Sequence, residues 1–126
     1  MRLRQLFSTK KTGDDAERIA ERFLTRRNLT LVARNYRCRY GEIDLIMQDT
    51  ETLVFVEVRL RKPLRGKGDF GGALASITAS KQAKIIATAQ HYLAGMKHLP
   101  PCRFDVVLLN GLSVTDVEWI RNAFDA

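Results

Sequence analysis

Two strand-like runs joined by a short polar turn constrain this chain most, because each run carries acid among its apolar residues. They form residues 40–62, YGEIDLIMQDTETLVFVEVRLRK. The polar DTET segment at the centre suits a β-hairpin with a loop of about two or four residues. Since side chains alternate faces along a strand, either loop sets Asp44 opposite Glu57 and Glu42 opposite Arg59. The hairpin therefore brings two carboxylates face to face within a sheet.

Opposed carboxylates destabilise a sheet unless a cation lies between them. Glu42, Asp44 and Glu57 are hard oxygen donors of the kind that hold Mg²⁺ or Mn²⁺ together with water molecules. We therefore predict a Mg²⁺ (or Mn²⁺) site with these three residues as ligands, which would activate water for attack on a phosphodiester. Zinc is not expected, because the two His and two Cys residues show no paired ligand spacing. No Ser or Cys has a recognisable base partner for nucleophilic catalysis.

The charge balance favours an anionic partner. The 126 residues suffice for one domain, and 21 Lys and Arg against 14 Asp and Glu give a net charge of +7. Such an excess is typical of proteins that bind nucleic acid. An anionic membrane surface competes as partner, but no basic amphipathic helix with a bulky apolar face is predicted. Because no signal peptide or membrane-spanning stretch is found either, we expect a cytoplasmic protein with reduced cysteines and no membrane partner.

The order of the predicted elements is α-β-β-β-α-β-β, which indicates an α/β domain with a mixed central sheet flanked by helices. Residues 1–12 are expected to be a flexible basic N-terminal arm, and residues 13–126 a single domain. A capping box at Thr12 predicts the start of the first helix, and Asn110-Gly111 predicts a type I′ turn between the last two strands. Helices are predicted at 12–28 and 78–95, and strands at 29–36, on both sides of the acidic turn, at 102–109 and at 112–120.

Cations interleaved with aromatic rings precede the acidic hairpin, a pattern that suits contact with phosphates and bases. An edge strand guarded by charges is the alternative. After the hairpin, a Gly- and Pro-rich basic loop is a candidate clamp on a nucleic-acid backbone, or else a solvated linker. The candidate nucleic-acid contacts are Arg34, Tyr36, Arg37, Arg39, Arg61, Lys62, Arg65, Lys67 and, at the start of the second helix, Lys81.

Two polar residues on the predicted helices are further candidates for the site. Glu17 lies at the edge of the apolar stripe of the first helix, where it could reach the sheet or simply be solvated. Gln82 lies on the core-facing stripe of the second helix, so its amide needs partners. Beside Lys81 at a helix N-terminus, it could help to hold a phosphate or water. Hydrogen bonds to the backbone at the helix start are the alternative.

The spacing of Asp44 and Glu57-Val58-Arg59 on adjacent strands resembles the PD-(D/E)xK nuclease superfamily. Within it, nearly the whole chain resembles the YraN-type bacterial proteins, a family grouped with Holliday-junction-resolvase-like domains. The matching segments are Ala16-Glu17, Arg34-Asn35-Tyr36-Arg37, Gly41-Glu42-Ile43-Asp44-Leu45-Ile46, Phe55-Val56-Glu57-Val58-Arg59, Lys81-Gln82 and Arg103-Phe104-Asp105-Val106-Val107.

The resemblance implies a restriction-endonuclease-like fold, with Asp44 and Glu57 as metal ligands and Glu17 as the helix acid that completes the site. Arg59 stands where a catalytic lysine is usual. Arginine stays protonated, so it can stabilise developing charge but can hardly act as a base. Resolvase-like relatives often work as dimers, which allows a homodimer, although nothing in the chain specifies an interface.

We therefore expect a metal-dependent nuclease acting on DNA, with branched or damaged DNA as the candidate substrates. The alternative is a non-catalytic nucleic-acid-binding or adaptor protein on a degenerate nuclease scaffold. A third hypothesis is a sheet face of salt bridges, with Glu42 paired to Arg59 and Asp105 paired to another arginine.

Overall fold

The structure, a computed structural model, describes residues 2–60, 77–112 and 116–126, with side chains from residue 13 onward. Its elements follow the predicted order α-β-β-β-α-β-β, so this prediction is confirmed. They are the helix α1 (Arg2–Thr25), the strands β1 (Thr30–Cys38), β2 (Gly41–Asp49) and β3 (Thr52–Leu60), the helix α3 (Ala79–Leu93), and the strands β4 (Cys102–Leu109) and β5 (Val117–Phe124).

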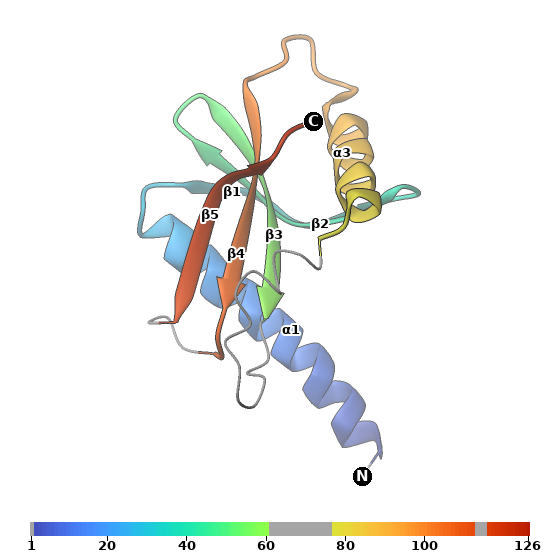
Figure 1. Cartoon of the computed structure of the whole chain (residues 1–126), viewed down its shortest axis with the longest axis vertical. Helices are drawn as coiled ribbons and strands as arrows, with labels where there is room; N and C mark the ends of the chain where they lie inside the picture. Colours follow the sequence, from blue (N-terminus) through green and yellow to red (C-terminus); the bar gives the residue numbers. More distant parts are fainter. Residues whose placement is uncertain (1, 61–76, 113–115) are drawn as a thin grey trace.

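The five strands form one sheet in the order β1-β2-β3-β4-β5 (Figure 1). Strands β3 and β4 are parallel, and every other neighbouring pair is antiparallel. A parallel pair cannot be joined by a tight turn, and the long connection from β3 to β4 carries α3. The predicted mixed α/β architecture is therefore confirmed.

The two helices pack against different core clusters of the sheet. The predicted stripe of α1 is confirmed, because Ala16, Ala20 and Leu24 are buried against Leu45 and Val56 among other sheet residues. The helix α3 buries Ile85 and Ala89 in a second cluster, with Phe55 and Phe104. Side chains of β3 alternate between the two clusters, as the period of a strand requires. Neither helix is long and apolar enough to cross a membrane within the described residues.

The acidic hairpin has the predicted register, from Asp49 opposite Thr52 to Leu45 opposite Val56. The two residues between the strands include Thr50, whose φ of 52° gives the tight reversal that a short loop needs. Beyond Leu45 the ladder ends. There β2 stays paired with β1, while β3 continues beside β4. The two strands thus form a fork, with the β1–β2 end diverging from β3 (Figure 1).

Two local predictions are wrong. The helix α1 begins at Arg2, so Thr12 is not its N-cap; residues 2–12 contain good helix formers such as Arg, Leu, Gln and Lys. The expected flexibility of residues 1–12 stays a prediction. The last two strands do not meet through a type I′ turn, which needs positive φ at both central residues. Here only Gly111 of the pair has positive φ, 118°, and the Asn110 N–H closes a wider loop on the Asp116 carbonyl at 2.9 Å.

Candidate functional site

Asp44 and Glu57 meet where the fork between β2 and β3 opens. Their carboxyl groups are hydrogen-bonded to each other. Since the ladder has already ended, the Val58 N–H donates to Asp44 Oδ2 at 2.8 Å instead of to a β2 carbonyl. The side chain of Asp44 therefore continues the strand pairing where the backbone of β2 turns away. The predicted approach of these two acids is confirmed.

Burial makes the ionised forms of this pair unfavourable. It raises the pKa of Glu57 to about 8, and the charge of Asp44 adds to the increase. Burial also raises the pKa of Asp44, against the effect of the Val58 N–H. The hydrogen bond between the two favours ionised Asp44 and protonated Glu57. At neutral pH the pair thus holds one proton, which Glu57 donates to Asp44.

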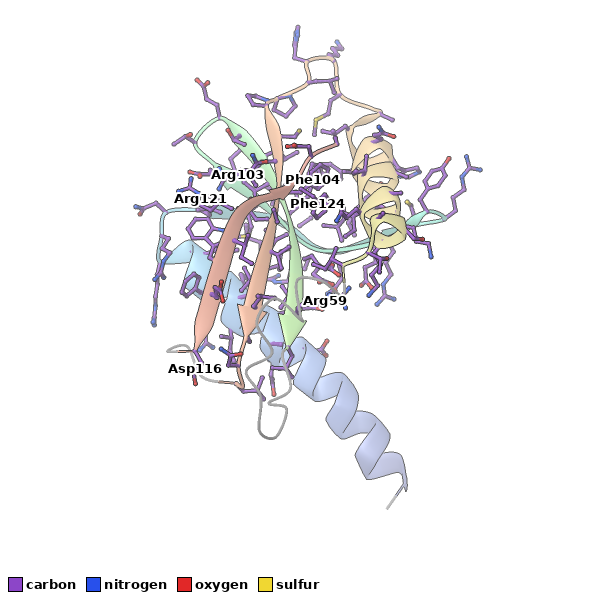
Figure 2. The ribbon with its side chains drawn as sticks, viewed as in Figure 1. Arg59, Arg103, Phe104, Asp116, Arg121 and Phe124 are labelled. Atoms are coloured by element: carbon purple, nitrogen blue, oxygen red, sulfur yellow. The ribbon has the colours of Figure 1, made fainter. Side chains whose placement is uncertain are left out.

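Two cations stand beside the pair. Arg59 Nη2 lies 3.0 Å from Glu57 Oε2, and Figure 2 shows Arg59 on β3 near the side that faces α3. Two buried nitrogens of Arg59, Nε and Nη2, have no hydrogen-bond partner in the described part of the chain. The ion pair is therefore close in distance but leaves N–H groups free. The charge of Lys81, in the first turn of α3, also acts on Glu57.

Glu17 reaches the site from α1. Burial raises its pKa to about 7, and the charges of Asp44 and, more weakly, Glu42 raise it further. A hydrogen bond from the Asn35 side chain opposes this increase. A hollow of about 200 Å³, whose lining includes Glu17, Asn35 and Leu45, opens between α1 and the sheet. The side chain is therefore close enough to interact with the acid pair, as predicted, and is not simply solvated.

Glu42 does not join the pair in the predicted way. Its partner is Arg37 on β1, with Nε 3.0 Å from Oε1, so the predicted pairing of Glu42 with Arg59 is wrong. The physical reason is the fork, because this end of β2 has left β3 and lies against β1. Within the described side chains, no three Asp, Glu, His or Cys residues gather as metal ligands. The third ligand predicted for the metal is thus held apart by an arginine.

Gln82 is half-buried at the start of α3, where its Nε2 donates to the Ile77 carbonyl at 3.1 Å. This is the backbone contact expected of a glutamine that completes a helix start. Its predicted part in the site stays a prediction.

The residues that were predicted to contact nucleic acid on β1 and in the turn after it interact with neighbouring side chains. Arg34 forms a two-point ion pair with Glu21, with distances of 2.7 and 2.9 Å. The Tyr36 hydroxyl lies 2.6 Å from His91 Nδ1, and its ring packs on Tyr92. Arg39 contacts the ring of its neighbour Tyr40. The candidates Arg61, Lys62, Arg65 and Lys67 lie outside the described residues.

Asp105 is a separate buried acid, and the predicted arginine partner is confirmed. Arg103 Nε lies 3.0 Å from Asp105 Oδ1, while Trp119 Nε1 and the Asn122 N–H each donate to this carboxylate at 2.9 Å. Figure 2 shows Arg103 well away from Arg59. This network ties β4 to β5 and belongs to the scaffold.

Asn35 is the site residue that sequence reasoning missed. Its φ of 50° is one that asparagine tolerates better than most residues, and it brings the amide to Glu17. An asparagine between Arg34 and Tyr36 in a predicted strand was the available signal, and it does not reveal a contact with a helix.

Comparison with known proteins places the chain among relatives of similar length. The sequence model of the uncharacterised protein family UPF0102 matches residues 16–109. A UPF0102 protein of Nitrosomonas europaea is 58% identical over 113 residues, which cover 90% of this chain and 92% of the relative. One from Nitrosospira multiformis is 59% identical over 113 residues, with the same coverage of 90% and 92%. One from Psychromonas ingrahamii is 50% identical over 121 residues, covering 96% of this chain and 95% of the relative.

Proposed function

We propose that this chain, which belongs to the uncharacterised protein family UPF0102, is a metal-dependent nuclease that hydrolyses phosphodiester bonds in DNA. The observation that carries the proposal is the contact between Asp44 and Glu57 at the fork of β2 and β3. Two largely buried carboxylates that share a proton form a site where a divalent cation can replace that proton. We extend the proposal to a restriction-endonuclease-like core, on the resemblance of the motif.

The donor set fits Mg²⁺ or Mn²⁺, since these ions bind through one or two carboxylates and keep several waters. Asp44 and Glu57 would hold the ion, and Glu17 is close enough to orient a water bound to it. A bound Mg²⁺ would lower the pKa of a coordinated water and neutralise charge on the phosphate. Glu42 is excluded from this set in its observed pairing with Arg37.

The cations of the site supply the remaining electrostatics. Arg59 has N–H groups without a partner among the described residues, and these could donate to a phosphate oxygen. Lys81 adds a second positive charge near Glu57. Neither residue needs to give up a proton, so their proposed role is to stabilise negative charge that develops on the phosphate. A net charge of +7 attracts the polyanion.

A second candidate function is nucleic-acid binding without cleavage. The ion pair between Arg59 and Glu57, 3.0 Å, favours it, because the guanidinium neutralises part of the charge that a metal would need. A protein of this kind would use the same basic surface as an adaptor.

A cleavage assay separates the two functions. Purified protein is incubated with four-way junctions, flaps and linear duplex DNA in Mg²⁺ or Mn²⁺, with and without chelator, beside Asp44→Ala. A nuclease cuts at least one substrate, and both chelator and Asp44→Ala abolish the cutting. Salt-dependent retention of DNA that is never cut in either metal would favour the adaptor. Preferential cutting of junctions would support branched DNA as substrate and motivate a test for a homodimer by light scattering.

Calorimetric titration with Mg²⁺ and Mn²⁺ tests the metal site apart from any substrate. Asp44→Ala is the variant expected to lose binding. If neither ion binds the parent protein, the metal hypothesis fails.

A further inference from the structure

One side of α3 carries two lysines and a histidine in a row that starts at the acid pair. Lys81, Lys84 and His91 are exposed on one side of the helix, and the fully buried Thr88 lies between Lys84 and His91 on that side. The sequence of α3, ASKQAKIIATAQHYL, contains no acidic residue. The row from residue 81 to residue 91 is about 15 Å long at the rise of an α-helix.

The beginning of β2 lies directly against this row. A Cβ atom on Gly41 would be 3.2 Å from Thr88 Oγ1 and 3.8 Å from Lys84 Cβ. A contact of 3.2 Å would force Thr88 to shift slightly, and the φ of 152° at this position favours glycine over other residues. The approach sets the β1–β2 turn, with Arg39 and Tyr40, alongside the exposed side of α3.

Tyr40 and His91 meet edge to face across this boundary, with an interplanar angle of 63°, and we call this pair the aromatic platform. Their ring centroids are 6.1 Å apart, and Tyr40 is 42% exposed. Arg39 Nη2 donates to the Tyr40 hydroxyl at 2.8 Å, and His91 Nδ1 lies 2.6 Å from the Tyr36 hydroxyl. Both rings of the platform are therefore held in place, and a cation stands beside them.

We propose that α3 and the β1–β2 turn form a track for single-stranded DNA, in which Lys81 and Lys84 contact phosphates and a base stacks on Tyr40 beside His91. Exposed aromatic rings beside cations are the combination that binds unpaired nucleotides with little sequence preference. In a duplex the bases already stack on one another, so the platform would gain little from it. The acid nearest to the turn, Glu42, is neutralised by Arg37 at 3.0 Å and does not repel the strand.

The direction in which a strand would run along the track rests on the proposed function. Lys81 is the end of the track next to Glu57, and the platform is the far end. A strand bound along α3 would lead away from the acid pair, so the preferred substrate would carry an unpaired segment beside the cleaved bond.

Fluorescence anisotropy tests the track in the presence of chelator, so that no cutting occurs. The probes are a fluorescein-labelled dT oligonucleotide, the same length with abasic sites, and a duplex. Tyr40→Ala is expected to weaken binding of the dT oligonucleotide about tenfold, the range found for loss of one stacked base. Binding of the abasic oligonucleotide and of the duplex should stay unchanged. Tyr40→Phe keeps the ring and should keep the affinity.

The contribution of the lysines is measured separately, from the salt dependence of binding of the dT oligonucleotide. The double change Lys81→Gln and Lys84→Gln is expected to reduce the slope of log affinity against log salt by about 1.4, or 0.7 for each phosphate contact of a single strand. Lys97→Gln, which alters an exposed lysine beyond the end of α3, is the matched control and should leave the slope unchanged.

Three results would overturn the track: no binding of the dT oligonucleotide, equal effects of Tyr40→Ala on all three probes, or an equal loss in Tyr40→Phe. The outcome is separable from that of the nuclease. If the protein cuts DNA and binds single strands independently of Tyr40, the proposed track is wrong and the proposed active site stands. If the protein never cuts DNA but binds single strands through Tyr40, the proposed track stands and the proposed nuclease activity is wrong.

Discussion

Glu57 and Asp105 are acids on neighbouring parallel strands, and their surroundings differ completely. Asp105 lies opposite Val56, the residue before Glu57. It is fully buried and accepts hydrogen bonds from Arg103, Trp119 and the Asn122 backbone. Glu57 instead shares a proton with a second acid.

The difference indicates how to tell a structural acid from a candidate site. A buried carboxylate with a full set of donors is stabilised in its charged form and has no capacity for a further ligand. The Asp44–Glu57 pair has fewer donors than its oxygens can accept, so burial raises the pKa of both groups. Such a pair is stabilised by any cation that enters. Four experiments test this contrast, and the largest expected effect comes first.

Asp105→Asn should reduce the free energy of unfolding by about 3 kcal/mol, because the buried amide has one acceptor oxygen in place of two and leaves a donor of Arg103, Trp119 or the Asn122 backbone unpaired. Arg103 itself keeps Asp49 as a charged partner at 2.9 Å. The matched change is Asp44→Asn, whose amide oxygen can still accept from the Val58 N–H. We expect that variant to stay within about 1 kcal/mol of the parent, or to be more stable, since it removes a repelled carboxylate. Urea denaturation at pH 7 measures both. Equal losses of unfolding free energy in the two variants would show that both acids stabilise the fold to the same extent.

Alkaline pH should destabilise the protein through Glu57. Its pKa is raised from its ordinary value of 4.5 to about 8 on folding, so the folded state holds a proton that the unfolded chain has lost. That contribution to stability is complete below pH 4.5, and it disappears as pH rises through about 8. We expect the free energy of unfolding to fall by about 2 kcal/mol or more between pH 5 and pH 9.

Glu57→Gln carries no proton to lose and should remove the part of this slope near pH 8, while the part near pH 7 that Glu17 contributes should remain. The control is Glu51→Gln in the exposed β2–β3 loop, where the slope should match that of the parent. If the free energy of unfolding of Glu57→Gln falls near pH 8 as steeply as that of the parent, other groups cause the loss of stability there.

The features that could be predicted from the sequence are those set by local pattern. The hairpin register follows from a two-fold period and a short loop, so Asp44 and Glu57 were placed together without any knowledge of the rest of the sheet. The stripe of Ala16, Ala20 and Leu24 follows from the helical period in the same way.

What could not be predicted depends on the choice of neighbours. The first residues of β2 pair with β1 but not with β3, and this depends on the packing of the whole sheet. As a result, Glu42 forms an ion pair with Arg37 and not with Arg59. The contact of Asn35 with Glu17 depends on a positive φ within a strand and on where α1 crosses it. Both are long-range consequences of packing, which no spacing along the chain encodes.

Metal affinity should depend on pH through the same shared proton. A cation that binds Asp44 and Glu57 must displace the proton, so affinity for Mg²⁺ should rise by up to about tenfold per pH unit below pH 8 and level off above it. Calorimetry at pH 6, 7, 8 and 9, in two buffers of different ionisation enthalpy, measures the affinity and the proton released. Glu51→Gln, in the exposed β2–β3 loop, is the control that leaves the site intact, and it should keep this release. Affinity that is flat over the whole range would argue against binding at the pair.

Arg59→Lys should have the smallest effect, because the proposed role needs only a positive charge near Glu57. Lysine retains the charge and can approach the phosphate as a single point, so any cleavage rate should stay within about threefold of the parent, about 0.7 kcal/mol, or rise. Arg59→Gln removes the charge and should reduce the rate far more. Single-turnover cleavage of the best DNA substrate compares the three proteins. A complete loss in Arg59→Lys would instead mean that the planar guanidinium, with the N–H groups that lack partners among the described residues, donates to the phosphate at two points.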